Sequence, residues 1–280
     1  EQMRGKGLKP VIGCEVWITN ENDRDKPSRI LLLCKSYSGY LLLCRLLSRA
    51  YRENQYQGQA EIRKSWLNKN ELGTQGLIAL SGACFGEINM ALMQDNFDRA
   101  KILAQEWSDL FPGHFYIEIQ RIGRDDEEIV LQNSLALSSD LSLPVVATHP
   151  IQFLSPDEYT AHEARVCIAE GYVLGDSRRV KRFTKQQYFK TQAEMETLFS
   201  DVPVALANSV EIAKRCNQLL ELGVNRLPLF PTPNDESLEK YLYSQASEGL
   251  DNRMKLLFPD RNTRDKKIAI YRARLDFELT

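Results

Sequence analysis

The three histidines of this chain, His114, His149 and His162, are its clearest candidates for metal binding or proton transfer. No two of them form the His-x-His or His-x-x-x-His pair with which a single strand or helix holds a metal ion. His114 follows a Pro-Gly turn and His162 lies in a predicted helix, so structural roles are favoured for both. His149 ends the apolar run 145–148, where active sites of α/β proteins gather, although Pro150 follows and a lone neutral imidazole is the alternative.

Glu15 is an acidic residue inside the apolar run 11–18, which is predicted to be a strand. Burial would raise the pKa of its carboxyl group unless a cation or a hydrogen-bond donor compensated the charge. Arg29, in the next predicted strand, can supply that cation, and an ion pair between the two is the structural interpretation. The functional interpretation makes Glu15 a working or vestigial metal ligand.

Four basic residues gather in one short segment beside aromatic side chains: Arg178, Arg179, Lys181 and Arg182. Such a patch can contact the phosphate backbone of a nucleic acid. A solvated loop is the more common cause of such a run of charges. Binding that weakens with added salt would distinguish the two.

The elements that must position these residues alternate between short apolar runs and helical patterns over residues 8–230. Strands are predicted at residues 11–18, 29–34, 77–81, 115–119 and 145–148, and helices at 40–51, 85–93, 97–111, 127–138, 158–169, 194–199 and 204–216. This alternation is typical of parallel strands joined by crossover helices, so the predicted class is α/β. The strands are apolar on both faces, and we therefore expect helices to cover the sheet. Thr191 and Glu194 have the spacing of a capping box.

A change in composition follows at residues 227–233, where three prolines favour an extended connector. We place a domain boundary between residues 230 and 231. Beyond it, residues 236–258 and 264–280 show helical patterns only. The chain begins with Glu1 rather than Met, and its last helix has no Gly or Pro terminator, so we expect a piece of a longer protein.

The composition excludes several classes of protein. The chain has 280 residues, 43% of them hydrophobic, and a formal net charge of -2, which argues against holding nucleic acid by bulk charge. Its longest apolar runs are too short to cross a bilayer, so no contact with a membrane is expected. Six cysteines without any CxxC spacing fit reduced thiols and a cytoplasmic location.

Five segments together resemble a known family. They are residues 9–15 (KPVIGCE), 77–82 (LIALSG), 144–148 (PVVAT), 161–165 (AHEAR) and 205–216 (ALANSVEIAKRC). In combination they resemble the alpha subunits of bacterial DNA polymerase III, the C-family replicative polymerases. The resemblance assigns residues 1–230 to the polymerase and histidinol phosphatase (PHP) domain, and residues 231–280 to helices leading toward the palm.

The resemblance implies a fold and a function. The fold is a distorted (β/α)7 barrel, here without its first strands, because the family's His-x-His strand would precede Glu1. The function is DNA-directed DNA synthesis in replication by the parent subunit, with Mg²⁺, while the domain docks the proofreading exonuclease subunit beside other holoenzyme subunits. The catalytic aspartates of the palm would lie beyond Thr280, so we expect no catalytic residue in this chain, and DNA binding only through the parent protein.

Metal-binding relatives keep ligands at positions that this chain has mostly changed. They have an acid, a histidine, a cysteine and an Asp-x-His pair at the positions of Glu15, Arg29, Ala83, and Pro150 to Gln152. Only Glu15 matches. Cys84 and His149 are each displaced by one position, and a one-residue shift along a strand turns the side chain to the other face. An arginine would also repel a divalent ion.

We therefore predict that the pocket is free of metal and that the barrel is a structural and docking module. The rival hypothesis is a working PHP phosphoesterase or 3′-5′ exonuclease, in which clustered ions would activate water.

Overall fold

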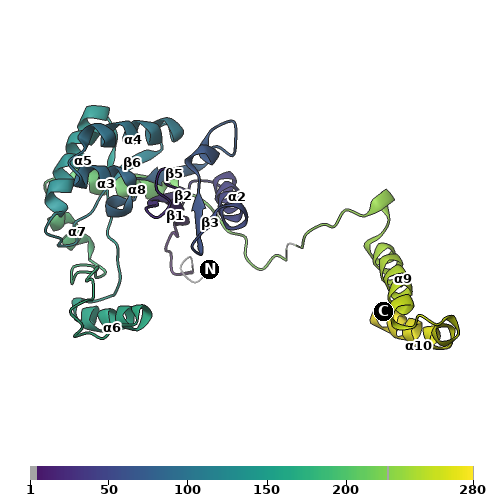
Figure 1. The fold of residues 1–280 in the computed structure, drawn as a ribbon. Helices are drawn as coiled ribbons and strands as arrows, with labels where there is room; N and C mark the ends of the chain where they lie inside the picture. The colour runs from purple at the N-terminus through teal and green to yellow at the C-terminus, as the bar shows by residue number, and fades with distance from the viewer. Residues whose placement is uncertain (1–4, 226, 280) are drawn as a thin grey trace. The chain divides into compact units, whose positions relative to one another are not determined.

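The computed structural model describes residues 5–225 and 227–279. The chain forms two compact units, Glu1–Leu220 and Glu221–Thr280 (Figure 1). In the described part of the chain, the first unit holds a seven-stranded sheet in the order β3-β4-β1-β2-β5-β6-β7. The strands are β1 (Gly13–Ile18), β2 (Ser28–Cys34), β3 (Gln55–Tyr56), β4 (Gln59–Ile62), β5 (Leu77–Leu80), β6 (Phe115–Ile119) and β7 (Val145–Ala147).

The predicted α/β class is confirmed, but the prediction of parallel strands holds only for part of the sheet. The pairs β5–β6, β6–β7 and β1–β4 are parallel. In contrast, β2 runs antiparallel to both β1 and β5. The segment 19–27 that joins β1 to β2 is too short for the crossover that parallel neighbours require, and it therefore closes a hairpin.

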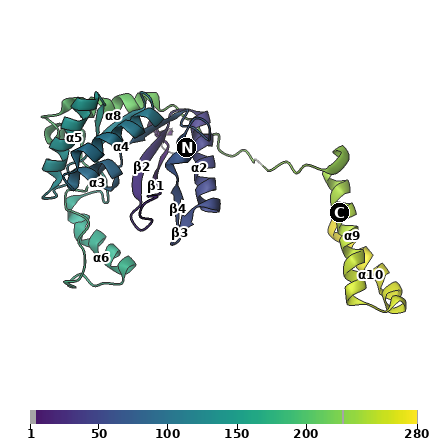
Figure 2. The same ribbon diagram turned by 45° about the horizontal axis from the view of Figure 1, so that its top comes forward.

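Helices pack on both faces of the sheet. The first unit contains α2 (Tyr37–Glu53), α3 (Glu87–Met93), α4 (Phe97–Leu110), α5 (Glu127–Leu141), α6 (Tyr159–Glu170), α7 (Gln192–Leu198) and α8 (Pro203–Arg215), with short 3₁₀ helices η1 (Lys64–Leu67), η2 (Ala83–Phe85) and η3 (Pro156–Glu158). Figure 2 shows α3, α4 and α5 grouped beside the sheet, with α2 next to β4.

The side chains of β5 show how both faces become buried. Leu77 and Ala79 belong to the larger hydrophobic cluster, which includes buried residues of α2 and α4. Ile78 and Leu80 point to the opposite face and pack in a second cluster with Ile212 of α8. This two-sided burial is the reason why the strand is apolar throughout.

Local signals in the sequence set several helix boundaries. The Ser36 hydroxyl accepts a hydrogen bond from the Gly39 amide, so α2 begins at Tyr37, before the predicted position. The capping box predicted for Thr191 and Glu194 starts α7. The β3–β4 hairpin was not predicted, because its strands are short and mostly polar.

Residues 151–190, here called the α6 module, leave the sheet after β7 and carry α6 away from the strands (Figures 1 and 2). Aromatic contacts tie the module together: the ring of His162 lies 4.8 Å from that of Phe183 and 5.5 Å from that of Phe153. A bridge between Phe153 and Tyr188 closes the module at its base.

The second unit contains the short helix η4 (Pro233–Asp235) and a pair of longer helices, α9 (Leu238–Leu257) and α10 (Arg261–Leu279). The two long helices contact each other through Phe258 and Tyr271 and through an ion pair between Arg272 and Asp251. Residues 216–225 and 227–232 form no helix or strand, and the predicted boundary at 230 falls next to η4. Over the ranges that the structure covers, no helix has the length and apolar character needed to span a membrane.

Candidate functional site

The candidate functional site lies where the parallel strands β5, β6 and β7 end. Glu118 is near the end of β6, Thr148 directly follows β7, and Gly82 follows β5. The carboxyl ends of parallel strands meet at one edge of a sheet, and ligand sites of α/β proteins concentrate there. The antiparallel strand β2 begins at the same edge, because Gly82 approaches the Arg29 carbonyl so closely that an added Cβ would lie 2.2 Å from its oxygen.

Glu118 is the buried acid of this site. Its carboxylate accepts hydrogen bonds from the Gly82 amide at 3.1 Å, from the Gln120 side-chain amide at 3.2 Å and from the Thr148 hydroxyl. Burial raises the pKa of the carboxyl group, the three donors oppose that effect, and the nearby charge of Glu15 adds to it. The site therefore holds an acid whose ionised form is costly and is stabilised only by neutral donors.

Glu15 and Arg29 form the ion pair that the structural interpretation of the sequence predicted. The Arg29 Nη1 atom lies 3.2 Å from the Glu15 Oε2 atom, and the guanidinium group stacks 4.0 Å from the ring centre of Trp17 and 4.5 Å from that of Phe85. The Glu15 side chain is 49% exposed, so the burial considered for it does not occur. Arg29 is thus held beside the site by two aromatic rings and one carboxylate.

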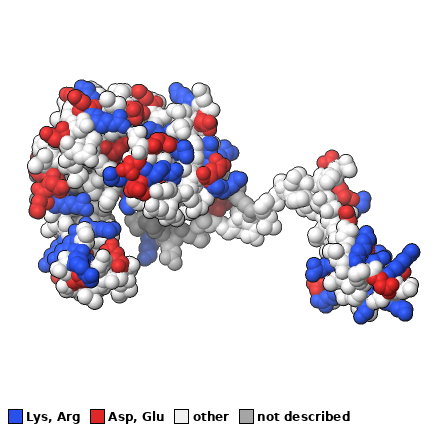
Figure 3. All heavy atoms as spheres, in the orientation of Figure 1, with Lys and Arg blue, Asp and Glu red and all other residues white. Residues whose placement is uncertain are grey.

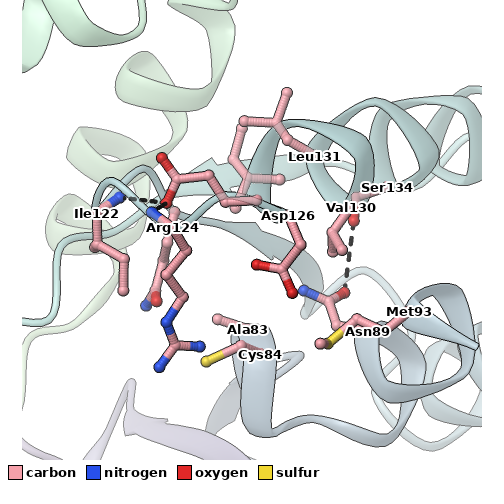
Figure 4. Close-up of a pocket in the computed structure, with 13 residues that line it drawn as sticks. Ala83, Cys84, Asn89, Met93, Ile122, Arg124, Asp126, Val130, Leu131 and Ser134 are labelled. Carbon is pink, nitrogen blue, oxygen red and sulfur yellow. Dashed lines mark hydrogen bonds between the residues drawn. The ribbon is translucent and has the colours of Figure 1, made fainter. Parts of the chain in front are cut away.

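A small pocket adjoins the site between η2, α3 and the start of α5 (Figure 4). Its lining brings the Cys84 thiol and the Arg124 guanidinium close together, as Figure 4 shows. Burial raises the pKa of the Cys84 thiol, and Arg124 opposes that effect. The Glu127 carboxylate accepts hydrogen bonds from the amides of Ile122 and Arg124 and thereby fixes the loop that carries the arginine.

The structure corrects the expectation that a shift of one position turns the Cys84 side chain away from the site. A one-residue shift reverses a side chain on a strand, but Ala83 and Cys84 lie in the 3₁₀ helix η2, and both line the pocket. Ala83 has a φ of 43°, in the left-handed region that residues with a side chain seldom occupy. The displacement from Ala83 therefore does not remove the Cys84 thiol from this part of the molecule.

The segment after β7 holds the remaining predicted positions. The His149 Nε2 atom contacts the Gln186 carbonyl at 2.9 Å, and burial lowers the pKa of the imidazole, which favours its neutral form. The Pro150 carbonyl accepts a hydrogen bond from Gln187, and the Gln152 amide donates to the Gln187 carbonyl. His149, Pro150 and Gln152 thus anchor the base of the α6 module.

The basic segment of residues 178–182 is divided among different environments. Arg179 forms a buried ion pair with Glu163, and its side chain is only 5% exposed. Arg178 pairs with Asp176 and Arg182 with Glu170, whereas Lys181 is exposed. Figure 3 shows basic side chains around α6 intermixed with acidic ones. Arg179 is thus a structural residue here, and the nucleic-acid contact remains a prediction for the other three.

The described residues bring together no group of three or more His, Cys, Asp or Glu side chains that could hold a metal ion. Whether the pocket binds metal in solution stays a prediction. Sequence reasoning missed Glu118 as a site residue, although the signal was present: like Glu15, it is an acid inside an apolar strand. It also missed Arg124, whose role depends on the loop conformation that Glu127 imposes.

Comparison with known proteins adds to these observations. Residues 1–122 match the PHP domain family. The chain is 46% identical over 278 residues to DNA polymerase III subunit alpha of Neisseria meningitidis serogroup A, covering 99% of this chain and 24% of that protein. The same subunit of Pseudomonas aeruginosa is 42% identical and that of Escherichia coli O6:H1 is 38% identical, each over 98% of this chain and 23% of the relative.

The chain therefore spans about a quarter of the length of the curated relatives it matches. These similarities confirm the resemblance drawn from the five sequence segments. Nearly the whole chain is thus similar to part of the DNA polymerase III alpha subunits, and its first 122 residues match the PHP domain family.

Proposed function

We propose that this chain is the PHP region of a replicative DNA polymerase, and that the whole protein is a DNA-directed DNA polymerase that uses Mg²⁺ in the cytoplasm. The observation that carries the proposal is the 46% identity over 99% of the chain to a polymerase III alpha subunit. The free cysteines of the described chain agree with a reducing compartment. Restoring the complete protein and measuring primer extension with and without Mg²⁺ tests this proposal.

Within that protein we propose a structural role for the PHP region rather than a catalytic one. The arrangement at the candidate site supports this role, because Arg29 places a fixed cation beside Glu15 and stacks between two rings. Glu118 is already satisfied by the Gly82, Gln120 and Thr148 donors. Among the residues that the structure describes, neither acid belongs to a group of three or more His, Cys, Asp or Glu side chains that could hold a metal ion.

Metal content and nuclease activity test this structural role. Purified chain dialysed against Mn²⁺ or Zn²⁺ should retain well under one equivalent of metal, measured by elemental analysis. It should also show no metal-dependent nuclease turnover. One or more tightly held equivalents, together with turnover that Glu15→Gln abolishes, would establish the phosphoesterase or exonuclease alternative instead.

We also propose that the region docks the proofreading exonuclease subunit, as the family resemblance implies. The α6 module offers a surface for such a partner, since the side chains of Ile168 and Val173 are 82% and 69% exposed. Large exposed apolar side chains of this kind often mark contact sites. The module also projects from the sheet, where a partner can reach it (Figures 1 and 2).

A pull-down of the exonuclease subunit by the immobilised chain tests the docking proposal. Replacing both Ile168 and Val173 with Asp should reduce retention at least tenfold. Ile129→Asp is the matched control, because Ile129 is 68% exposed on α5 and should leave retention unchanged. Equal retention by the double variant and the parent chain would exclude the α6 module as the docking surface.

A further inference from the structure

A cluster of basic residues lies at the end of the sheet opposite the candidate functional site. His114 immediately precedes β6, Lys35 follows β2, and Arg215 is the last residue of α8. Lys9 precedes β1 and reaches the same end of α8, where its amino group donates to the Ala213 carbonyl at 2.6 Å. Four elements thus bring three cations and an imidazole together.

The imidazole of His114 lies between two of these cations. The Lys35 Nζ atom is 2.8 Å from the Nε2 atom of His114, and the Arg215 guanidinium contacts the Nδ1 atom. Arg215 also donates to the Tyr116 hydroxyl oxygen at 2.6 Å and to the Gly113 carbonyl at 3.1 Å. These contacts hold the arginine in one orientation, with one terminal nitrogen at the Tyr116 hydroxyl and the other at the Gly113 carbonyl and the His114 ring.

The hydrogen-bonding capacity of the ring cannot satisfy both neighbours. A neutral imidazole has one nitrogen that accepts and one that donates, while lysine and arginine can only donate. One of the two contacts therefore sets an N–H group against another N–H group. An acceptor placed at that contact would relieve the conflict, and an anionic acceptor would also balance the charge.

No acid supplies that balance within the described part of the chain. The ion pairs seen among the described residues do not include Lys35 or Arg215, and the Glu211 carboxylate one turn before Arg215 pairs with Lys214 instead. The pKa of His114 is lowered first by burial and then by Lys35 and Arg215, and no acid acts on it. Burial raises the pKa of the neighbouring Cys216 thiol, whereas the positive charges of Lys9, Arg215 and Lys35 lower it.

We propose that Lys35, His114 and Arg215 form a binding site for a phosphoryl oxyanion. The guanidinium fork matches two oxygens of a phosphate, and the lysine adds a point charge. With the anion bound at one of the two contacts, the ring donates its N–H group to the anion and its other nitrogen accepts from the remaining cation. Inorganic phosphate and a phosphate of a DNA backbone share this chemistry and are the two sources to be distinguished. This inference does not depend on the proposed function.

Titration of the 280-residue chain with inorganic phosphate, at constant ionic strength set with chloride, tests the proposal. The chain has only three histidines, so their ring protons can be followed separately by NMR. Phosphate should shift the His114 signals in a saturable manner and raise the pKa of this imidazole. His162, far from the cluster in the α6 module, serves as an internal control.

Variants then assign the site. Lys35→Gln should weaken phosphate binding at least tenfold while leaving the chain folded, because the hydrogen bond seen for its side chain among the described residues is the one to His114. Arg215→Lys keeps a charge but loses the fork, and it should weaken binding as well. Lys101→Gln is the control, because it removes an exposed lysine of α4 that pairs with Asp140 of α5. This variant should bind phosphate as the unchanged chain does.

A parallel titration with short single-stranded DNA identifies the source. A His114 response to both ligands supports the site and includes the DNA backbone among its ligands, while a response to phosphate alone assigns it to free phosphate. If neither ligand moves the His114 signals beyond the effect of chloride, the proposal is wrong. Equal phosphate binding by Lys35→Gln and the unchanged chain would overturn it too.

Discussion

Two carboxylates at the candidate site are held in opposite ways. Glu15 is half-exposed and balanced by the charge of Arg29, whereas Glu118 is buried and balanced only by neutral donors. An ion pair near solvent loses little hydration and contributes little to the free energy of folding. A buried carboxylate without a charged partner has a desolvation cost that neutral donors offset only in part. At the scale of single residues, Glu118 is therefore the group that makes this site sensitive to pH.

Replacing Glu118 with Gln should change the pH dependence of stability. Because the pKa is raised in the folded state, that state binds the proton more tightly, and stability falls as pH rises from the unfolded value, 4.5, through the folded value. Glutamine does not titrate. The free energy of unfolding of Glu118→Gln, relative to that of the unchanged chain, should therefore rise by about 1.4 kcal/mol per pH unit across that window.

Urea unfolding at several pH values between 4 and 8 measures this difference. Any loss of hydrogen bonding in the variant is independent of pH, so the slope and not the absolute stability carries the result. Glu211→Gln, on an exposed position of α8, should leave the slope unchanged. Parallel curves for Glu118→Gln and the unchanged chain would contradict the prediction.

Arg29 should contribute more through its aromatic neighbours than through Glu15. Arg29→Met should lower the free energy of unfolding by about 1–2 kcal/mol, because it removes the stacking on Trp17 and Phe85. Glu15→Gln should cost less than about 1 kcal/mol, since the pair is partly exposed. Chemical denaturation at neutral pH measures the free energy of unfolding of both variants. Equal losses of stability in Arg29→Met and Glu15→Gln would disprove the prediction.

Helices and strands could be predicted from the sequence where a short stretch of neighbouring residues determines them. The Thr191–Glu194 capping box and the apolar strands β5 and β6 are local patterns, and the structure confirms them. The antiparallel direction of β2 follows from the short segment that joins it to β1. The alternation of strands and helices in the sequence does not take the length of that segment into account. The η2 turn was not predicted, because its second left-handed residue is Ala83, which follows the left-handed Gly82 and is of a type that seldom adopts this conformation.

The candidate site was partly predictable for the same reason. The Glu15–Arg29 pair could be foreseen because both residues interrupt neighbouring apolar strands. The donors to Glu118 could not, because Gly82 and Thr148 reach it from segments that are distant in sequence. Arg179 looked solvated, since nothing in the sequence indicated that Glu163 would be buried on the facing side of α6.

A buried ion pair should contribute much of the stability of the α6 module. Glu163 and Arg179 form an ion pair with exposed fractions of 3% and 5%, which ties the basic segment to α6. Arg179→Met should destabilise the module by about 3 kcal/mol, because it leaves a buried charge without its partner. The double variant Glu163→Leu with Arg179→Met should recover most of that loss.

Hydrogen exchange followed by mass spectrometry measures the effect within the module. Exchange should accelerate in residues 159–182 of the single variant and leave β5 and β6 unaffected. If the double variant exchanges as fast as the single one, the ion pair is not the cause. Arg178→Met, at a position 80% exposed, is the matched control.

At the scale of the whole molecule, the first unit contains its hydrophobic core within its own residues. Both hydrophobic clusters consist of residues that precede position 217. In the described part of the second unit, only Met254 is a buried hydrophobic side chain, although α9 and α10 are long helices. Long helices that bury so little apolar surface derive little stability from tertiary packing.

The two units should therefore differ in stability. A chain that ends at residue 220 should unfold within about 2 °C of the 280-residue chain, because a change of 1 kcal/mol shifts the midpoint of a domain this size by roughly that amount. In the longer chain, the helical circular-dichroism signal of the α9–α10 pair should be lost at a lower temperature than the sheet. Calorimetry of both chains measures the first effect, and circular dichroism measures the second. A truncated chain that unfolds many degrees earlier would show that the core depends on residues 221–280, contrary to the composition of the two clusters.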